Sequence, residues 1–107
     1  MNMAYEPYSV LMAIYKNDDP EYFRISLKSM LSQSVPPDEV VLVLDGSIPH
    51  VLQAVIDELD TGHPNIIRTV ALPKNVGLGT ALKIGVTQCK NELIARMDAD
   101  DISAGSL

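Results

Sequence analysis

Apolar residues along the chain follow two periods, one typical of buried strands and one typical of helices that pack on a sheet. Short apolar runs such as "YSVLMAI" and "EVVLVLD" have strand length. Between these runs, apolar residues recur three or four positions apart, which predicts a helix in each interval. Strands are expected at residues 8–14, 39–45, 66–72 and 92–97, and helices at about residues 20–34, 51–59 and 78–90.

The first predicted helix has a clear start signal in the sequence. Asp19 is the expected N-cap, Pro20 suits the first helical position, and Glu21 complements the positive end of the helix dipole. Val35 precedes a proline and is driven towards extended geometry, so the helix should end before it. Apolar residues at helical spacing should face the sheet, namely Phe23, Leu27, Met30 and Leu31.

The second predicted strand is apolar on both faces until it reaches Asp45. Strands of this kind belong to parallel sheets that helices cover on both sides. The alternation of strands and helices therefore predicts an α/β fold, a three-layer α/β/α sandwich with a mainly parallel, Rossmann-like sheet. Ligands of such sheets bind beyond the carboxyl ends of the strands, so polar residues at those ends are the first candidates for a site.

Composition and charge narrow the function classes. The chain has 107 residues, a formal net charge of -6 and a pI near 4.6, which indicates one acidic domain. Nucleic acid is not an expected partner, because proteins that bind it use a basic surface. The single cysteine, Cys89, cannot form an internal disulfide. With no apolar run of roughly 20 residues and no signal-peptide pattern, we expect a cytoplasmic protein.

Most polar residues after the predicted strands have a structural explanation beside a functional one. Residues 45–47, Asp-Gly-Ser, form either a turn with a helix cap or part of a binding site. Gly77, Gly79 and Gly85 are either close-packing glycines or a loop that holds phosphate. They do not match the dinucleotide fingerprint, whose glycines follow the first strand directly. Tyr15 is either a packing residue or a stacking platform.

Three carboxylates, Asp98, Asp100 and Asp101, lie within four residues after the last predicted strand. If partly desolvated, like charges this close repel one another by about 1 kcal/mol or more unless a cation offsets them. Carboxylate and phosphate oxygens are the ligands that Mg²⁺ and Mn²⁺ prefer. We therefore favour a metal site over the alternative, a solvated loop in which Asp101 caps a following helix.

Segments at successive strand ends together resemble the N-terminal half of family 2 glycosyltransferases with the GT-A fold, over about residues 8–101. "SVLMAIYKNDDP" resembles the first strand and tyrosine turn of that family, and "VVLVLDGS" its second strand with Asp-Gly-Ser. "NVGLGTALKIGV" resembles its Asn-x-Gly loop and third helix, and "ELIARMDADDIS" its Asp-x-Asp segment. The order of the four motifs is far more specific than any one of them.

The resemblance implies a site for a nucleotide-sugar donor of the UDP or dTDP type, with Mg²⁺ or Mn²⁺ as the cofactor. Tyr15 would stack on the base beside the Ala13 backbone, and Asp45 would accept a hydrogen bond from the base edge. Asp98 would contact the ribose or the metal shell, and Asp100 would hold the ion at the diphosphate. The implied nucleotide-binding residues are Ala13, Tyr15, Asp45, Gly77, Asp98 and Ala99, and the implied metal ligands are Asp98 and Asp100, with Asp101 as an alternative.

The resemblance also implies inverting transfer of the sugar to a hydroxyl of a saccharide, lipid-linked or other acceptor. The catalytic base and the acceptor-binding half would follow Leu107. Residues 1–107 are therefore expected to form a single truncated donor-binding domain that holds no catalytic residue and is inactive alone. The parent enzyme would work in the cytoplasm or at the cytoplasmic face of a membrane, and surface exposed by truncation suggests self-association.

Departures from the family pattern leave other classes of protein open. Lys16 stands where the family often has asparagine, Leu44 replaces the first of two acids, and Lys83 replaces an asparagine of the third helix. A sugar nucleotidyltransferase would need a glycine-rich, basic loop after the first strand. A non-enzymatic α/β binding or receiver-like module is the other alternative. A receiver would need an acid after the third strand, where this chain has "LPKNVG".

Overall fold

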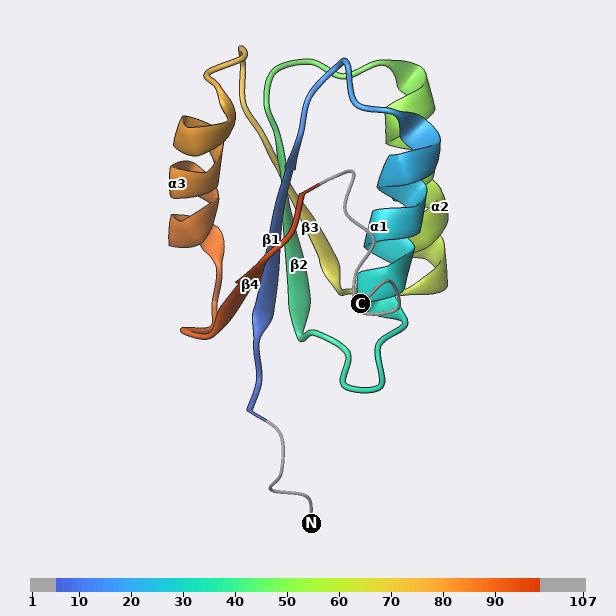
Figure 1. Cartoon of the computed structure of the whole chain (residues 1–107), viewed down its shortest axis with the longest axis vertical. Helices are drawn as coiled ribbons and strands as arrows, with labels where there is room; N and C mark the ends of the chain where they lie inside the picture. Colours follow the sequence, from blue (N-terminus) through green and yellow to red (C-terminus); the bar gives the residue numbers. More distant parts are fainter. Residues whose placement is uncertain (1–5, 99–107) are drawn as a thin grey trace.

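The computed structural model describes residues 6–98, where strands and helices alternate as the sequence predicts (Figure 1). Across this range, no helix has both the length and the apolar character that crossing a bilayer requires. The strands are β1 (Ser9–Ile14), β2 (Glu39–Leu44), β3 (Ile67–Ala71) and β4 (Ile94–Arg96), and the helices are α1 (Pro20–Leu31), α2 (His50–Gly62) and α3 (Leu78–Gln88).

The described strands form one sheet in the order β3-β2-β1-β4, and every neighbouring pair is parallel. β1 pairs with β2 along its whole length and with β4 over residues 9–11. α1 and α2 cover one face of the sheet, and α3 covers the other (Figure 1). The predicted three-layer α/β/α sandwich with a parallel sheet is confirmed.

Alternate residues of the central strands face the two helical layers. In β1, Met12 packs in the cluster that includes α1 and α2, whereas Leu11 and Ala13 pack in the cluster with α3. Every residue of β1 and β2 is buried, which explains why both strands are apolar on both faces beyond their first residues, Ser9 and Glu39. The residues of α1 that were predicted to face the sheet all lie in the core: Phe23, Leu27, Met30 and Leu31.

The start of α1 is as the sequence predicts. The Asp19 side chain accepts hydrogen bonds from the backbone N–H groups of Glu21 at 2.9 Å and Tyr22 at 3.0 Å. Pro20 occupies the first helical position, where its missing N–H costs no helical hydrogen bond. The cap satisfies two of the N–H groups that a helix start leaves without partners.

α2 does not begin where the interpretation of residues 45–47 as a turn with a helix cap requires. The N-cap of α2 is Pro49, which makes no side-chain hydrogen bond, and the helix begins at His50. The interpretation of residues 45–47 as a helix cap is therefore wrong. The turn is separated from the helix, and the Asp45 carboxylate is used elsewhere, as described below.

Gly85 explains the close approach of α3 to the sheet. A Cβ atom at this position would overlap the Leu11 side chain and lie 2.8 Å from Cγ2 of Val43. Gly85 is thus a close-packing glycine, one of the two roles considered for the glycines of this region. A Cβ atom at Gly77 or Gly79 would meet nothing within 4 Å, so packing does not explain those two glycines.

A buried polar cluster closes the end of the sheet where β2 begins, which lies opposite the carboxyl ends of the strands. The Glu39 carboxylate accepts hydrogen bonds from Ser9 Oγ at 2.6 Å and from the Lys90 backbone at 2.5 Å, and it pairs with Arg68 at 3.5 Å. Burial raises the pKa of the nearby Cys89 thiol, and the Glu39 charge adds to the rise, partly offset by Arg68 and Ser9. The contacts tie three strands to the turn after α3.

Candidate functional site

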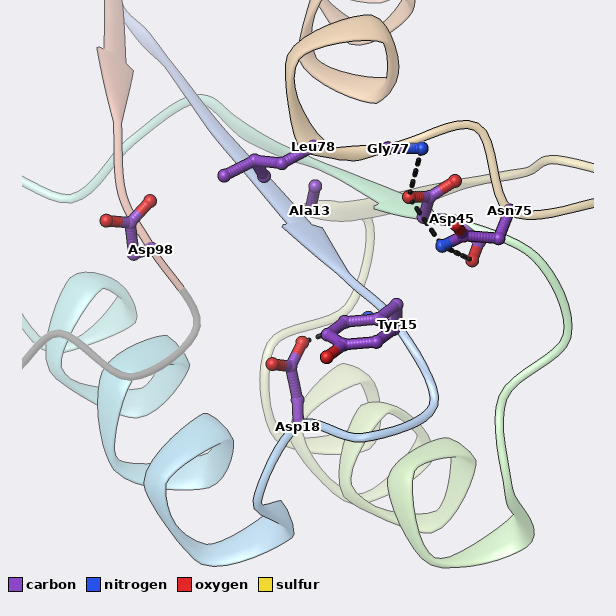
Figure 2. A pocket seen from close by; sticks show the side chains of 8 residues that line it. All are labelled: Ala13, Tyr15, Asp18, Asp45, Asn75, Gly77, Leu78 and Asp98. Atoms are coloured by element: carbon purple, nitrogen blue, oxygen red, sulfur yellow. Dashed lines mark hydrogen bonds between the residues drawn. The ribbon is translucent and has the colours of Figure 1, made fainter.

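The carboxyl ends of the parallel strands share one edge of the sheet, and a cavity of about 450 Å³ lies there (Figure 2). Strand order reverses at this point, because β4 lies beyond β1 rather than beside β3. Sheets of this type bind ligands at such a reversal. The cavity is lined by Ala13, Tyr15, Asp18, Asp45, Asn75, Gly77, Leu78 and Asp98.

Tyr15 follows β1 directly, and a tight turn holds it against the cavity. The Asp18 backbone N–H donates to the Tyr15 carbonyl at 3.0 Å, and the Tyr15 N–H donates to Oδ2 of Asp18 at 2.9 Å. Tyr15 is 40% exposed, and its ring lies between Ala13 and Asp18 in the close view (Figure 2). An exposed ring on a backbone held by two hydrogen bonds offers a flat apolar face to a ligand.

Asp45 follows β2 and is 5% exposed. Its Oδ1 accepts a hydrogen bond from the Val76 backbone N–H at 2.7 Å. Its Oδ2 accepts from Asn75 Nδ2 at 2.9 Å and from the Gly77 N–H at 3.1 Å. The carboxylate therefore fixes the loop between β3 and α3 at the rim of the cavity (Figure 2).

Gly46 allows this loop to come so close. Its φ is +89°, a conformation that residues with a Cβ atom rarely adopt. A Cβ atom here would lie 2.9 Å from the backbone nitrogen of Asn75. The pair Asp45-Gly46 thus works as a unit, since the acid attracts the loop and the glycine leaves room for it.

Asp98 lies just beyond β4 and faces the cavity from the side opposite Asp45 (Figure 2). Its side chain is exposed, and carboxylate oxygens are suitable ligands for a hard divalent cation. Ala99, Asp100 and Asp101 lie outside the described residues. Among residues 6–98, no three His, Cys, Asp or Glu side chains are grouped to hold a metal ion. The described part of the predicted metal site is therefore Asp98.

A second cavity, of about 400 Å³, shares three of its residues with the first. Tyr15, Asp45 and Asn75 line both cavities, so the two form adjoining parts of one depression at the strand ends. Lys16 and Lys74 line only the second cavity. Its other lining residues are Gly46, Ser47 and Pro73.

The structure adds Asp18, Asn75 and Leu78 to the residues that the sequence singled out. The sequence contained a signal for a second role of Asp18. Two adjacent acids precede α1, and one of them suffices to cap the helix. Asn75 was visible only as part of a motif, because its contact with Asp45 spans 30 residues of sequence. Leu78 gave no signal beyond its place at the start of a predicted helix.

A sequence profile described as Glycosyl transferase family 2 matches residues 9–106. The chain belongs to glycosyl transferase family 2. The match covers every strand and helix of the described range and all the strand ends that surround the cavity. The resemblance inferred from the four motifs is confirmed at the level of the family and of the α/β fold.

Curated relatives extend over most of this chain. It is 43% identical over 96 residues to the UDP-Gal:alpha-D-GlcNAc-diphosphoundecaprenol beta-1,3-galactosyltransferase of Escherichia coli, covering 90% of the chain and 34% of that protein. It is 41% identical over 95 residues to the amylovoran biosynthesis glycosyltransferase AmsE of Erwinia amylovora, covering 89% and 35%. The chain therefore spans about a third of the length of these relatives.

Solved structures share the fold. The mannosyltransferase PcManGT from Pyrobaculum calidifontis, in complex with GDP-Man and Mn²⁺, superposes with a TM-score of 0.77 at 22% identity, over 91% of this chain and 28% of that one. At this identity the likeness concerns the fold alone. S. aureus TarS 1–349 in complex with UDP superposes with a TM-score of 0.71 at 27% identity, over 89% and 28%.

Proposed function

We propose that this chain is the donor-binding part of an inverting glycosyltransferase and binds a UDP- or dTDP-sugar with Mg²⁺ or Mn²⁺. The observation that carries the proposal is the cavity at the strand-order reversal, which Tyr15, Asp45 and Asp98 line. Family membership supports it. Two further observations support it: the name of the 43% identical Escherichia coli relative includes the donor UDP-Gal, and TarS was solved in complex with UDP.

The base of the nucleotide would stack on the exposed Tyr15 ring, beside the backbone of Ala13. Asp45 would accept a hydrogen bond from the edge of the base, and Gly77 would lie beside the ribose or phosphates. Gly77 is the N-cap of α3 and provides no side-chain cap. The N–H groups at the start of that helix are therefore a favourable environment for the negative charge of a diphosphate.

The acidic segment after β4 would hold the divalent ion. Asp98 faces the cavity, and its carboxylate fits Mg²⁺ or Mn²⁺, so we assign it with Asp100 to the metal, with Asp101 as the alternative. Ala99 would contribute its backbone to the nucleotide. When bound, the ion would act as a Lewis acid that stabilises negative charge on the departing nucleoside diphosphate.

Transfer itself would need groups that we do not assign to this chain. A carboxylate base would deprotonate the acceptor hydroxyl, on a saccharide or a lipid-linked acceptor, for attack on the anomeric carbon from the face opposite the nucleotide. Both the base and the acceptor site would belong to the rest of a longer protein.

Incubated alone with UDP-sugars, the chain should release UDP only at the rate of slow hydrolysis. Faster release with a transferred sugar would contradict this part of the proposal.

Isothermal titration calorimetry with UDP tests the donor site. Saturable binding is expected in Mg²⁺ or Mn²⁺, and EDTA or the double substitution Asp98→Ala/Asp100→Ala should weaken it by about tenfold or more. The control is Asp57→Ala/Asp60→Ala on α2, which removes the same charge from an exposed helix away from the cavity. Equal UDP affinity in the two double variants would refute the proposed role of the acidic segment.

A further inference from the structure

Asp45 has less hydrogen-bonding capacity left for a ligand than its carboxylate suggests. A carboxylate oxygen has two lone pairs and can accept two hydrogen bonds. Oδ2 of Asp45 already accepts from Asn75 Nδ2 at 2.9 Å and from the Gly77 N–H at 3.1 Å. Oδ1 accepts only from the Val76 N–H, at 2.7 Å, among the described residues. One acceptor position therefore remains, and it is on Oδ1.

A single remaining acceptor matches some nucleobases better than others. Uracil and thymine present one ring N–H between two carbonyl oxygens. Guanine presents a ring N–H beside an amino group, two donors that match a carboxylate with both oxygens available. Cytosine has no proton on the corresponding ring nitrogen. A buried site that can accept only one hydrogen bond leaves the second guanine donor without a partner, which is costly.

We propose that Asn75 is a specificity-determining residue, which selects uracil or thymine over guanine by occupying Oδ2 of Asp45. The inference rests on the proposed donor site and adds how the base is chosen. In this proposal the Asn75 side chain acts through the Asp45 carboxylate rather than through a hydrogen bond of its own to the base. Its amide also donates to the Asp45 backbone carbonyl at 3.3 Å, so the group is held against Asp45 by two contacts.

Lysine side chains near Asp45 are suitable hydrogen-bond donors for the two carbonyl oxygens of uracil. Lys16 and Lys74 line the adjoining cavity together with Asp45 and Tyr15. Ammonium groups only donate hydrogen bonds, and the two carbonyl oxygens that flank the ring N–H of uracil only accept them. Asp45 thus lines a cavity whose charged donors complement the pattern acceptor, donor, acceptor of uracil and thymine.

The test compares UDP with GDP on the Asn75→Ala variant, by calorimetry in the same Mg²⁺ buffer. Removal of the Asn75 amide frees one position on Oδ2, so the carboxylate can accept two donors side by side. The preference for UDP over GDP should fall by about tenfold. The matched control is Asn91→Ala, which removes a hydrogen-bonded asparagine amide at the opposite end of the sheet and should leave the preference unchanged.

The ratio of UDP affinity to GDP affinity shows whether Asn75 selects the base or only stiffens the loop. If Asn75 only stiffened the loop, the variant would lose affinity for UDP and GDP by the same factor, and the inference would be wrong. The same conclusion would follow if Asn91→Ala changed the ratio as much as Asn75→Ala. Absence of UDP binding by the unaltered chain would instead overturn the proposed function itself. Circular dichroism of both variants serves as the check that each remains folded.

Discussion

The buried Asp45 carboxylate orders the rim of the cavity, because it accepts hydrogen bonds from three groups of the loop between β3 and α3. An acid directly after an apolar strand is visible in the sequence, and parallel strands place it at the ligand-binding edge. Its three loop contacts come from residues 30 to 32 positions away. Local periodicity contains no information on such contacts. The position of Asp45 at the ligand-binding edge could therefore be predicted from the sequence. Its remaining hydrogen-bonding capacity could be found only from the structure.

Gly46→Ala should lower the free energy of unfolding by about 1–3 kcal/mol, because it strains a residue at φ +89°. The added Cβ would also lie 2.9 Å from the Asn75 backbone nitrogen and displace the loop from Asp45. Urea unfolding followed by circular dichroism measures the change. UDP affinity should fall as well, since the rim of the cavity moves.

Gly62→Ala is the matched control for this substitution. Gly62 is the last residue of α2, its φ is not positive, and a Cβ atom there would meet nothing within 4 Å. Alanine has the better helix propensity by up to about 1 kcal/mol, so stability should be unchanged or slightly higher. Equal destabilisation by the two glycine substitutions would contradict the role given to Gly46.

At the scale of elements, the predicted strands and helices lie within a few residues of the observed ones. Period and cap signals are local, which explains the agreement at the start of α1. Among the strands, the largest difference is at β4, predicted at residues 92–97 and observed at Ile94–Arg96. Its length depends on pairing, and only residues 9–11 of β1 pair with it. Pairing is a property of the sheet and cannot be inferred from one apolar run.

Asp19→Ala should destabilise the chain by about 1 kcal/mol, because two N–H groups in the first turn of α1 lose their acceptor. Asp19 does not line either cavity, whereas its neighbour Asp18 lines the first. The affinity for UDP should therefore stay unchanged. Urea unfolding and calorimetry on the same variant check both statements. Lost affinity at unchanged stability would show that the two adjacent acids had been assigned the wrong roles.

At the scale of the whole molecule, the two ends of the sheet differ in chemistry. The end where β2 begins is closed by the buried contacts of Glu39 with Ser9, Lys90 and Arg68. The carboxyl ends of the strands are open and carry both cavities. The expectation of self-association stays a prediction, as do the acceptor half and the site of action in the cell. The central claim concerns the open end.

Chemical-shift mapping of UDP binding tests that claim most directly. In ¹H–¹⁵N spectra of the labelled chain with Mg²⁺, UDP should shift the backbone amides of Tyr15, Val76 and Gly77 at the open end. The amides of Lys90 and Asn91, at the closed end, should not move. Shifts confined to the closed end, or none at saturating UDP, would contradict a donor-nucleotide site at the carboxyl ends of the strands.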